Sequence, residues 1–214
     1  SQSRGLGDVY KRQSPSITFT TDTDTGIYRR GSGDIGFVSN STEIVNIDGN
    51  GLTVTSKDAT INSVTVGKGA NSVASNTVVG QGALDAAVSG VENTAIGNNT
   101  LTANTSGLAN TAVGADALKA VTTGGYNVAL GRDAGQSIVD GSSNTCVGAN
   151  ANDAGNTNNV TAIGNFALSD NTADNNTAVG HYALKANTTG TQNTAVGSLA
   201  CLLYTSDAAD ERNS

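Results

Sequence analysis

Apolar positions recur at a fixed spacing along residues 76–200, each time inside one short phrase. The phrase reads Asn-Thr-Ala-Val-Gly at residues 110–114, 176–180 and 193–197, and close variants occupy the other copies. A degenerate copy ends at Gly67, and the step from there to Gly80 is 13 (80 − 67). Within the array the steps between closing glycines are 17, 17, 17, 17, 16, 16 and 17, as the numbers show: Gly80, Gly97, Gly114, Gly131, Gly148, Gly164, Gly180 and Gly197. A fixed short period indicates a tandem array, which is typical of a solenoid.

Each repeat has the composition of a strand and turns, not of a helix. The common helical solenoid units begin at about 33 residues, which is well above the period of this array. Glycine, asparagine and threonine are also poor residues for a helix interior. Thr-Ala-Val suits a short strand, and the glycine after it permits a sharp corner. We therefore predict an all-β fold for residues 57–200, a parallel β-solenoid or β-roll of about nine short coils.

Two rows of side chains run along the predicted strands, because successive strand residues point to opposite faces. We predict that the bulkier row fills the interior: Val79, Ile96, Val113, Leu130, Val147, Ile163, Val179 and Val196. The smaller row is expected to form a smooth outer stripe that another chain can approach: Ala95, Ala112, Ala129, Ala162, Ala178 and Ala195. A solvated outer face would carry long polar residues, so we expect a homotrimer. The asparagines that open the repeats are expected to pair their amides along the axis.

A different module precedes the array. Residues 16–20, 26–28, 34–38, 43–47 and 52–54 read as short strands, which predicts a small, β-hairpin-rich module over residues 14–56. An Asp/Thr-rich turn is expected before Gly26. A second turn is expected at Asp48-Gly49-Asn50-Gly51.

Residues 1–13 and 201–214 continue neither pattern and resemble translated adapters of sequencing libraries. The codons GAT GTG TAT AAG AGA CAG encode Asp8 to Gln13, and their reverse complement, read one base out of frame, encodes Cys201 to Thr205. We therefore expect both ends to be cloning or assembly scars that make few packed contacts. The sequence is then expected to be a fragment of a longer native protein, open at both ends.

Composition limits the chemistry that the chain can perform. The net charge of −7 and the low aromatic content argue against a nucleic-acid groove, and no apolar run has the length of a membrane span. Cys146 occupies an alanine position of the repeat, so we expect a small buried residue and not a nucleophile. His181, the only histidine, is expected to face solvent at a corner.

No catalytic, cofactor-binding or metal-binding residue is predicted. Asp22 and Asp24 faintly resemble a calcium loop, but the remaining ligands are missing. The acids at Asp116, Asp133 and Asp153 fall at loops and corners, as do Asp170 and Asp174, and no pair of them has an obvious reason for a shifted pKa. We expect a protein that is not an enzyme.

The module over residues 14–56 resembles a segment common in phage tail-fibre proteins, where a Pro-x-x-x-Phe strand leads into Asp-x-Asp-Thr-Gly-Ile-Tyr. The matching positions are Pro15, Phe19, Asp22, Asp24, Thr25, Gly26, Ile27, Tyr28, Asn46, Ile47, Asp48 and Gly51. The Asn-Thr-Ala-Val-Gly-x-x-Ala-Leu array is similar to repeats of such fibres and of the head domains of trimeric autotransporter adhesins. The latter resemblance implies a left-handed parallel β-roll made by three chains.

These resemblances imply a structural and receptor-binding segment of a phage tail fibre, located in the virion tail outside the cell. Its partners would be two further copies of the chain and a glycan or protein of the host surface. The first alternative is the head domain of a bacterial trimeric surface adhesin, located at the cell surface. A non-catalytic part of a polysaccharide-degrading tail spike is a further alternative.

Overall fold

The computed structural model describes residues 17–19, 22–29, 35–40, 42–48, 51–54, 58–86 and 89–202. The chain divides into two compact units, Ser1–Ala59 and Thr60–Ser214. Strands dominate the described part of both units, and its only helical element is a 3-10 turn, η1, at Ala70–Ser72. The predicted all-β class is therefore confirmed. The two expected scars lie outside the described residues, except for Cys201 and Leu202.

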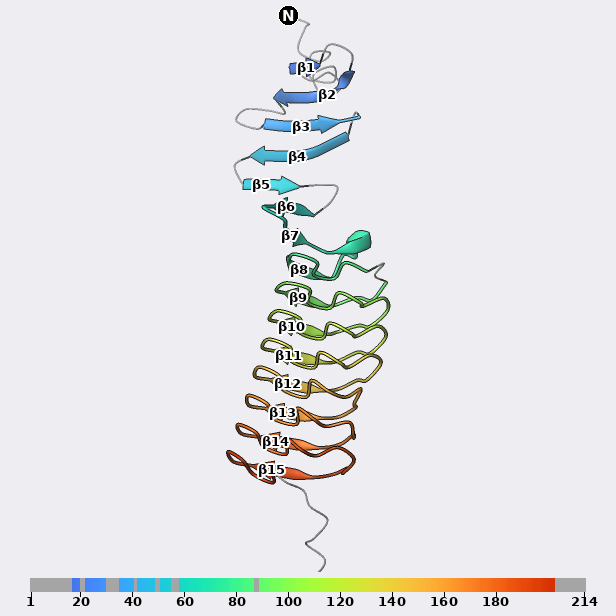
Figure 1. Ribbon diagram of the computed structural model, residues 1–214. Coiled ribbons are helices and arrows are strands. Elements are labelled where there is room, and N and C mark those ends of the chain that lie inside the picture. The colour runs from blue at the N-terminus through green and yellow to red at the C-terminus, as the bar shows by residue number, and fades with distance from the viewer. Residues whose placement is uncertain are drawn as a thin grey trace, which may run out of the picture. The chain divides into compact units, whose positions relative to one another are not determined.

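The first unit contains a five-stranded antiparallel sheet in the order β1-β2-β3-β4-β5 (Figure 1). Its strands are β1 (Ile17–Phe19), β2 (Asp22–Arg29), β3 (Ile35–Ser39), β4 (Thr42–Asp48) and β5 (Gly51–Val54). This meander confirms the predicted hairpin-rich module. The turn expected before Gly26 is wrong, because β2 already begins at Asp22, which pairs with Phe19. Thr23 and Thr25 are β-branched and favour the extended backbone, so the chain reverses before them.

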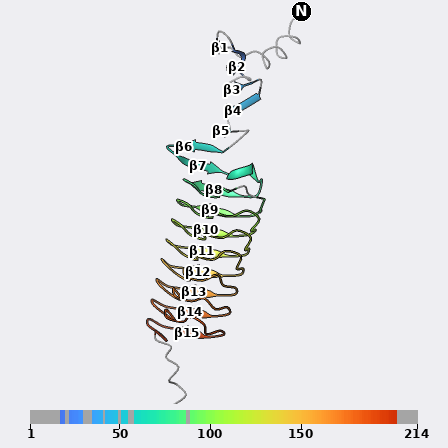
Figure 2. The ribbon, with the colours of Figure 1, turned by 45° about the vertical axis from the view of Figure 1, so that its right-hand side comes forward.

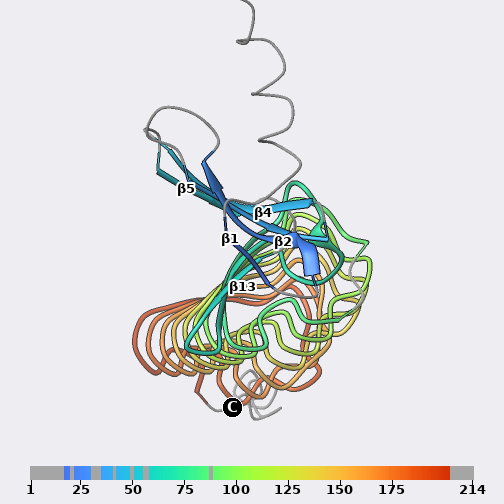
Figure 3. The ribbon, with the colours of Figure 1, turned by 90° about the horizontal axis from the view of Figure 1, so that it is seen from above.

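The second unit is a β-solenoid whose strands belong to one ten-stranded sheet. The strands are β6 (Ala59–Ile61), β7 (Val64–Gly67), β8 (Thr77–Gly80), β9 (Thr94–Ile96), β10 (Thr111–Val113), β11 (Val128–Leu130), β12 (Thr145–Val147), β13 (Thr161–Ile163), β14 (Thr177–Val179) and β15 (Thr194–Val196). From β8 to β15 the strands pair in parallel, seven pairs in register, so that each repeat lies on the next. Figures 1 and 2 show this stack, and Figure 3 shows its coils from above.

The predicted count of about nine coils is too high. Seven parallel pairings define seven turns, about 34 Å of rod at a rise of about 4.8 Å per turn. The degenerate copy that ends at Gly67 forms β7, which is antiparallel to β8 and therefore no coil. The step from Gly67 to Gly80 is shorter than any step within the array, so this segment is too short to complete a coil.

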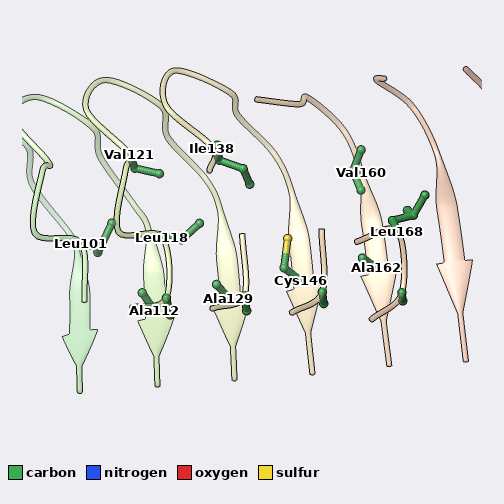
Figure 4. Close-up of a cluster of buried hydrophobic side chains, with 14 of the residues drawn as sticks. Leu101, Ala112, Leu118, Val121, Ala129, Ile138, Cys146, Val160, Ala162 and Leu168 are labelled. Atoms are coloured by element: carbon green, nitrogen blue, oxygen red, sulfur yellow. The ribbon is translucent and has the colours of Figure 1, made fainter. Parts of the chain in front are cut away.

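The inside and outside of the strands are the reverse of the prediction. The inner row consists of the small residues, which are buried in the core: Val78, Ala95, Ala112, Ala129, Cys146, Ala162, Ala178 and Ala195. Figure 4 shows Ala112, Ala129, Cys146 and Ala162 beside the buried side chains of Leu118 and Leu168. The bulkier row lies outside, and its side chains are partly or largely exposed, with Ile96 at 38% and Val196 at 72%.

A row of leucines explains this reversal. Leu118 is fully buried, and its Cδ2 lies only 2.9 Å from the point where a Cβ on Gly135 of the next coil would stand. Equivalent leucines fill the interior of four other coils: Leu84, Leu101, Leu168 and Leu184. So short a coil is narrow, and the strand that faces these leucines has room only for alanine, cysteine or, in β8, valine. The larger side chains of the strand must then point outward.

The buried leucines adopt a backbone conformation that leucine ordinarily avoids. Leu118 has a φ of 48° and Leu168 a φ of 54°. This left-handed conformation costs about 1–2 kcal/mol per residue, whereas full burial of a leucine side chain contributes about 1.5–3 kcal/mol. Burial therefore offsets the strain. In the coil after Gly131 the same position is Gly135, and Ile138 is buried beside it instead.

A buried asparagine row joins successive coils, as predicted. The Oδ1 atom of Asn110 accepts from the backbone N–H of Asn127 at 3.0 Å, and the Nδ2 atom of Asn110 donates to the carbonyl of Gly124 at 2.9 Å. Amides also pair directly along the axis, with Nδ2 of Asn144 donating to Oδ1 of Asn127 at 2.9 Å. Buried polar groups need such partners, so each asparagine satisfies backbone groups that the turn leaves open. The row contains Asn76, Asn93, Asn110, Asn127, Asn144, Asn176 and Asn193, of which only Asn193 is half-buried and the others are buried.

One asparagine side chain accommodates the loss of a single residue from the repeat. In a longer coil, the backbone N–H groups of residues 105–107 converge on the carbonyl of Thr122. In a shorter coil, the N–H groups of residues 139–141 converge on the Oδ1 atom of Asn156. The Nδ2 atom of Asn156 also donates to the carboxylate of Asp140. A side-chain carbonyl thus takes the place of a backbone carbonyl.

We expect Gly114→Ala to destabilise the solenoid by about 3 kcal/mol or more. Gly114 has a φ of 131°, and a Cβ on it would stand 2.5 Å from the carbonyl oxygen of Gly131 in the next coil. The free energy of unfolding, measured by urea titration, checks this. Asp116→Asn in the same coil is the control and should cost less than about 1 kcal/mol, because its ion pair is partly exposed. Equal losses for the two variants would contradict the expectation.

Candidate functional site

Cys146 and His181 lie where the sequence predicted them, whereas Asp22 and Asp24 do not lie in the expected turn. Cys146 is buried in the inner row, and burial raises the pKa of its thiol to about 12, so the thiolate is not formed near neutral pH. His181 is exposed at a corner. Asp22 and Asp24 lie in β2. Among the described residues, no group of three or more His, Cys, Asp or Glu side chains is placed to hold a metal ion.

The outer face of the solenoid sheet is a surface that the sequence analysis placed wrongly. We call its bulky residues the outer aliphatic row: Val79, Ile96, Val113, Leu130, Val147, Ile163, Val179 and Val196. A second row, two residues earlier in each strand, lies on the same face: Thr77, Thr94, Thr111, Val128, Thr145, Thr161, Thr177 and Thr194. Neither row contains a charged residue. A sheet face that only met water would carry charged or long polar side chains, so this face has the character of an interaction surface.

The sheet of the first unit also exposes aliphatic side chains. Ile35 of β3 pairs with Ile47 of β4, which pairs with Leu52 of β5. All three are exposed, with Leu52 at 67%. Directly paired residues lie on the same face of a sheet, so they form one apolar stripe across three strands. Each unit therefore presents an aliphatic surface.

Two acidic groups of the solenoid have shifted pKa values, although the sequence predicted none. A hydrogen bond from Lys119, at 2.9 Å, lowers the pKa of Asp116, and Asn99 contributes in the same direction. Burial raises the pKa of Asp153, and the charges of Asp133 and Asp170 raise it further. These neighbours of Asp153 come from the coils before and after it, and only the stacking brings them together.

Aromatic side chains gather at one corner of the later coils. Phe166 and Tyr182 occupy equivalent positions in successive coils, and their rings stack with centroids 5.1 Å apart and planes 3° apart. The ring of His181 meets Tyr182 edge-on at 4.1 Å. The ammonium group of Lys185 lies 5.6 Å from the Tyr182 centroid and 3.8 Å from the Asp170 carboxylate. The sequence pointed to His181 and Asp170 but to neither ring, although the change from Asn150 to Phe166 at the same repeat position was a visible signal.

No protein-family model matches the chain, and no curated protein or solved structure matches it either. Within the described residues, no helix is both long and apolar enough to span a membrane.

We expect Asp153→Asn to raise the thermal midpoint at pH 7. The folded state holds the proton of Asp153 more tightly than the unfolded state does, so stability falls as pH rises from the ordinary value of 3.8 through the raised pKa. The neutral amide removes this penalty and can still accept from Nδ2 of Asn150, which lies 2.9 Å from the present carboxylate. The gain should disappear in acid, below the ordinary aspartate pKa.

Asp116→Asn is the matched comparison, and its change in thermal midpoint at pH 7 should have the opposite sign. Its lowered pKa contributes stability that is present above 3.8 and is lost as pH falls through the folded value. The variant should therefore melt below the unmodified chain at pH 7 and converge with it in acid. Shifts of equal sign in both variants would contradict these assignments.

Proposed function

We propose that this chain is a structural, receptor-binding segment of a phage tail fibre, in which three copies associate and attach the virion to its host. The observation that carries the proposal is a regular rod with the outer aliphatic row on its exposed sheet face. The resemblance of the module and of the array to tail-fibre segments supports the virion role. This role needs a stiff rod and binding groups, and no catalytic step.

The partner of the outer aliphatic row is best matched by another copy of the same chain. The row repeats once per coil along seven turns, a spacing of about 4.8 Å set by the strand pairing. A second rod has the same spacing, so its side chains can interdigitate along the whole length. The resemblance to the adhesin heads implies that the number of copies is three. The row that faces outward is bulky, and its branched side chains bury more apolar surface on association than alanine would.

The head domain of a bacterial surface adhesin remains the alternative, because it uses the same kind of rod. The sequence of the parent gene distinguishes the two. A C-terminal self-cleaving chaperone domain would indicate a fibre, and a membrane anchor would indicate an adhesin. The charge-free outer face favours trimeric assembly in both cases.

We expect light scattering to give a mass of about three times the chain mass of 21.3 kDa. Ile163→Lys places charges inside the proposed interface, where burial of an unpaired charge is costly, and should yield a folded monomer. Thr123→Lys introduces the same charge at an exposed position outside both outer rows and should leave the trimer intact. A monodisperse monomer of the unmodified chain at micromolar concentration would refute the assembly.

We expect the fluorescently labelled full chain to bind cells of some bacterial strains in a saturable manner. A panel of diverse strains, measured by flow cytometry, provides the test. The Ile163→Lys monomer should bind the same strains at least tenfold more weakly, since three linked sites gain affinity from their linkage. Uniform weak adherence to every strain, unchanged in the monomer, would argue against a receptor-binding role.

A further inference from the structure

We propose that the corner formed by Phe166 and Tyr182 is a carbohydrate-binding site that takes pyranose rings of a cell-surface glycan. The proposal rests on the receptor-binding function proposed above and assigns that function to particular residues. Three properties of the corner support it: the backbone position, the chemistry of the neighbouring groups, and the size of the surface.

Phe166 and Tyr182 belong to what we call the corner row, the second residue after each repeat glycine. The row consists of Gly82, Asn99, Asp116, Asp133, Asn150, Phe166, Tyr182 and Leu199. Every member has a positive φ, including 58° at Asp133, 56° at Phe166 and 58° at Tyr182. From Asn99 onward each N–H donates to a carbonyl of the preceding coil, with Phe166 donating to Ala149 and Tyr182 to Asn165, both at 3.0 Å. The stacking thus imposes the same conformation on every coil.

This conformation favours glycine, asparagine and aspartate, and the first five coils carry those residues. Phenylalanine or tyrosine is strained in the left-handed region, because its Cβ approaches the backbone carbonyl closely. The core leucines offset such a cost by full burial. Phe166 and Tyr182 are only partly buried and lie outside the core cluster. Coils with Asn99 or Asp116 stack in the same way, so the rod does not need rings here. Strain that the fold does not require is typical of binding sites.

The groups around the rings suit a sugar. The stacked pair forms an apolar strip two coils high, and Leu199, which is 53% exposed, occupies the same row in the next coil. His181, Lys185 and Asp170 add hydrogen-bond donors and an acceptor beside this strip. A pyranose presents apolar C–H groups together with a rim of hydroxyls. Aromatic surface with a few placed polar groups is the usual composition of a small-molecule site.

The small size of the strip favours a glycan over a protein partner. A stable protein–protein interface buries about 800 Å² on each partner, far more than two rings and one leucine offer. The residues beside the strip, such as Asn165 and His181, are polar and exposed. A weak site of this kind becomes effective when an assembly presents three copies to a repeating polysaccharide.

The test uses the full chain on an array of purified bacterial polysaccharides and lipopolysaccharides. We expect the unmodified chain to bind a subset of them, and the double variant Phe166→Asn/Tyr182→Asn to bind at least tenfold more weakly. Because asparagine suits the corner row, the thermal midpoint of this variant should stay the same or rise. The number of copies in its assembly should not change. Tyr126→Asn is the matched control and should bind as the unmodified chain does. Tyr126 is an exposed tyrosine with a φ of 60° and no stacked ring among the described residues.

Lys185→Gln is a second variant, which removes the charge of the side chain and keeps a hydrogen-bond donor. Its binding to the polysaccharide should weaken several-fold, and the number of copies in its assembly should not change. The proposal would be overturned if no polysaccharide is bound or if the double variant binds unchanged. It would also be overturned if the double variant loses binding together with a fall in its thermal midpoint or in the mass of the assembly. Cell binding that survives periodate and is abolished by protease would also overturn it, but would leave the receptor-binding function standing.

Discussion

Hydrogen bonding between successive coils is the constraint on which the solenoid depends. Parallel pairing places each residue of a strand on its counterpart in the next repeat, so every coil must follow the same path. A backbone N–H or C=O group that departs from this path loses its hydrogen-bond partner in the neighbouring coil. Burying such a group without a partner is costly. Glycine at Gly114 and its equivalents, the asparagine row and the positive φ of the corner row all follow from this requirement. The packing of side chains is fitted to a path that the backbone already determines.

The repeat period and the residue types of the phrase are sufficient to predict the strands, the parallel stack and the amide pairing. The orientation of the strands is not predictable in the same way, because alternation alone does not state which face is inside. Volume alone favours the bulkier residues as the core, and the positions of Leu118 and Leu168 are needed to show that the interior is already full. The pKa shift of Asp153 depends likewise on Asp133 and Asp170, which lie in other coils. The five strands of the first unit are largely predictable from alternation, apart from the beginning of β2.

The residues that the stacking does not determine carry the information about function. A stacked position accepts few residue types, whereas an outward position accepts many. The outer aliphatic row and the aromatic pair are therefore choices that the fold leaves open. The aromatic pair is visible only by comparison between coils of the same chain, since each coil is a control for its neighbours. The absence of charge is common to all eight strands, whereas the rings occur in two consecutive coils.

The Asn156 side chain has a consequence for how such arrays change in evolution. A deletion within one coil would ordinarily displace every strand after it, as a frameshift displaces every later codon. Asn156 supplies the missing acceptor locally, and β13 still pairs in register with β12. The deletion is thereby confined to the coil in which it occurred. A chain built in this way can gain or lose single residues at its turns while the pitch of the rod stays unchanged.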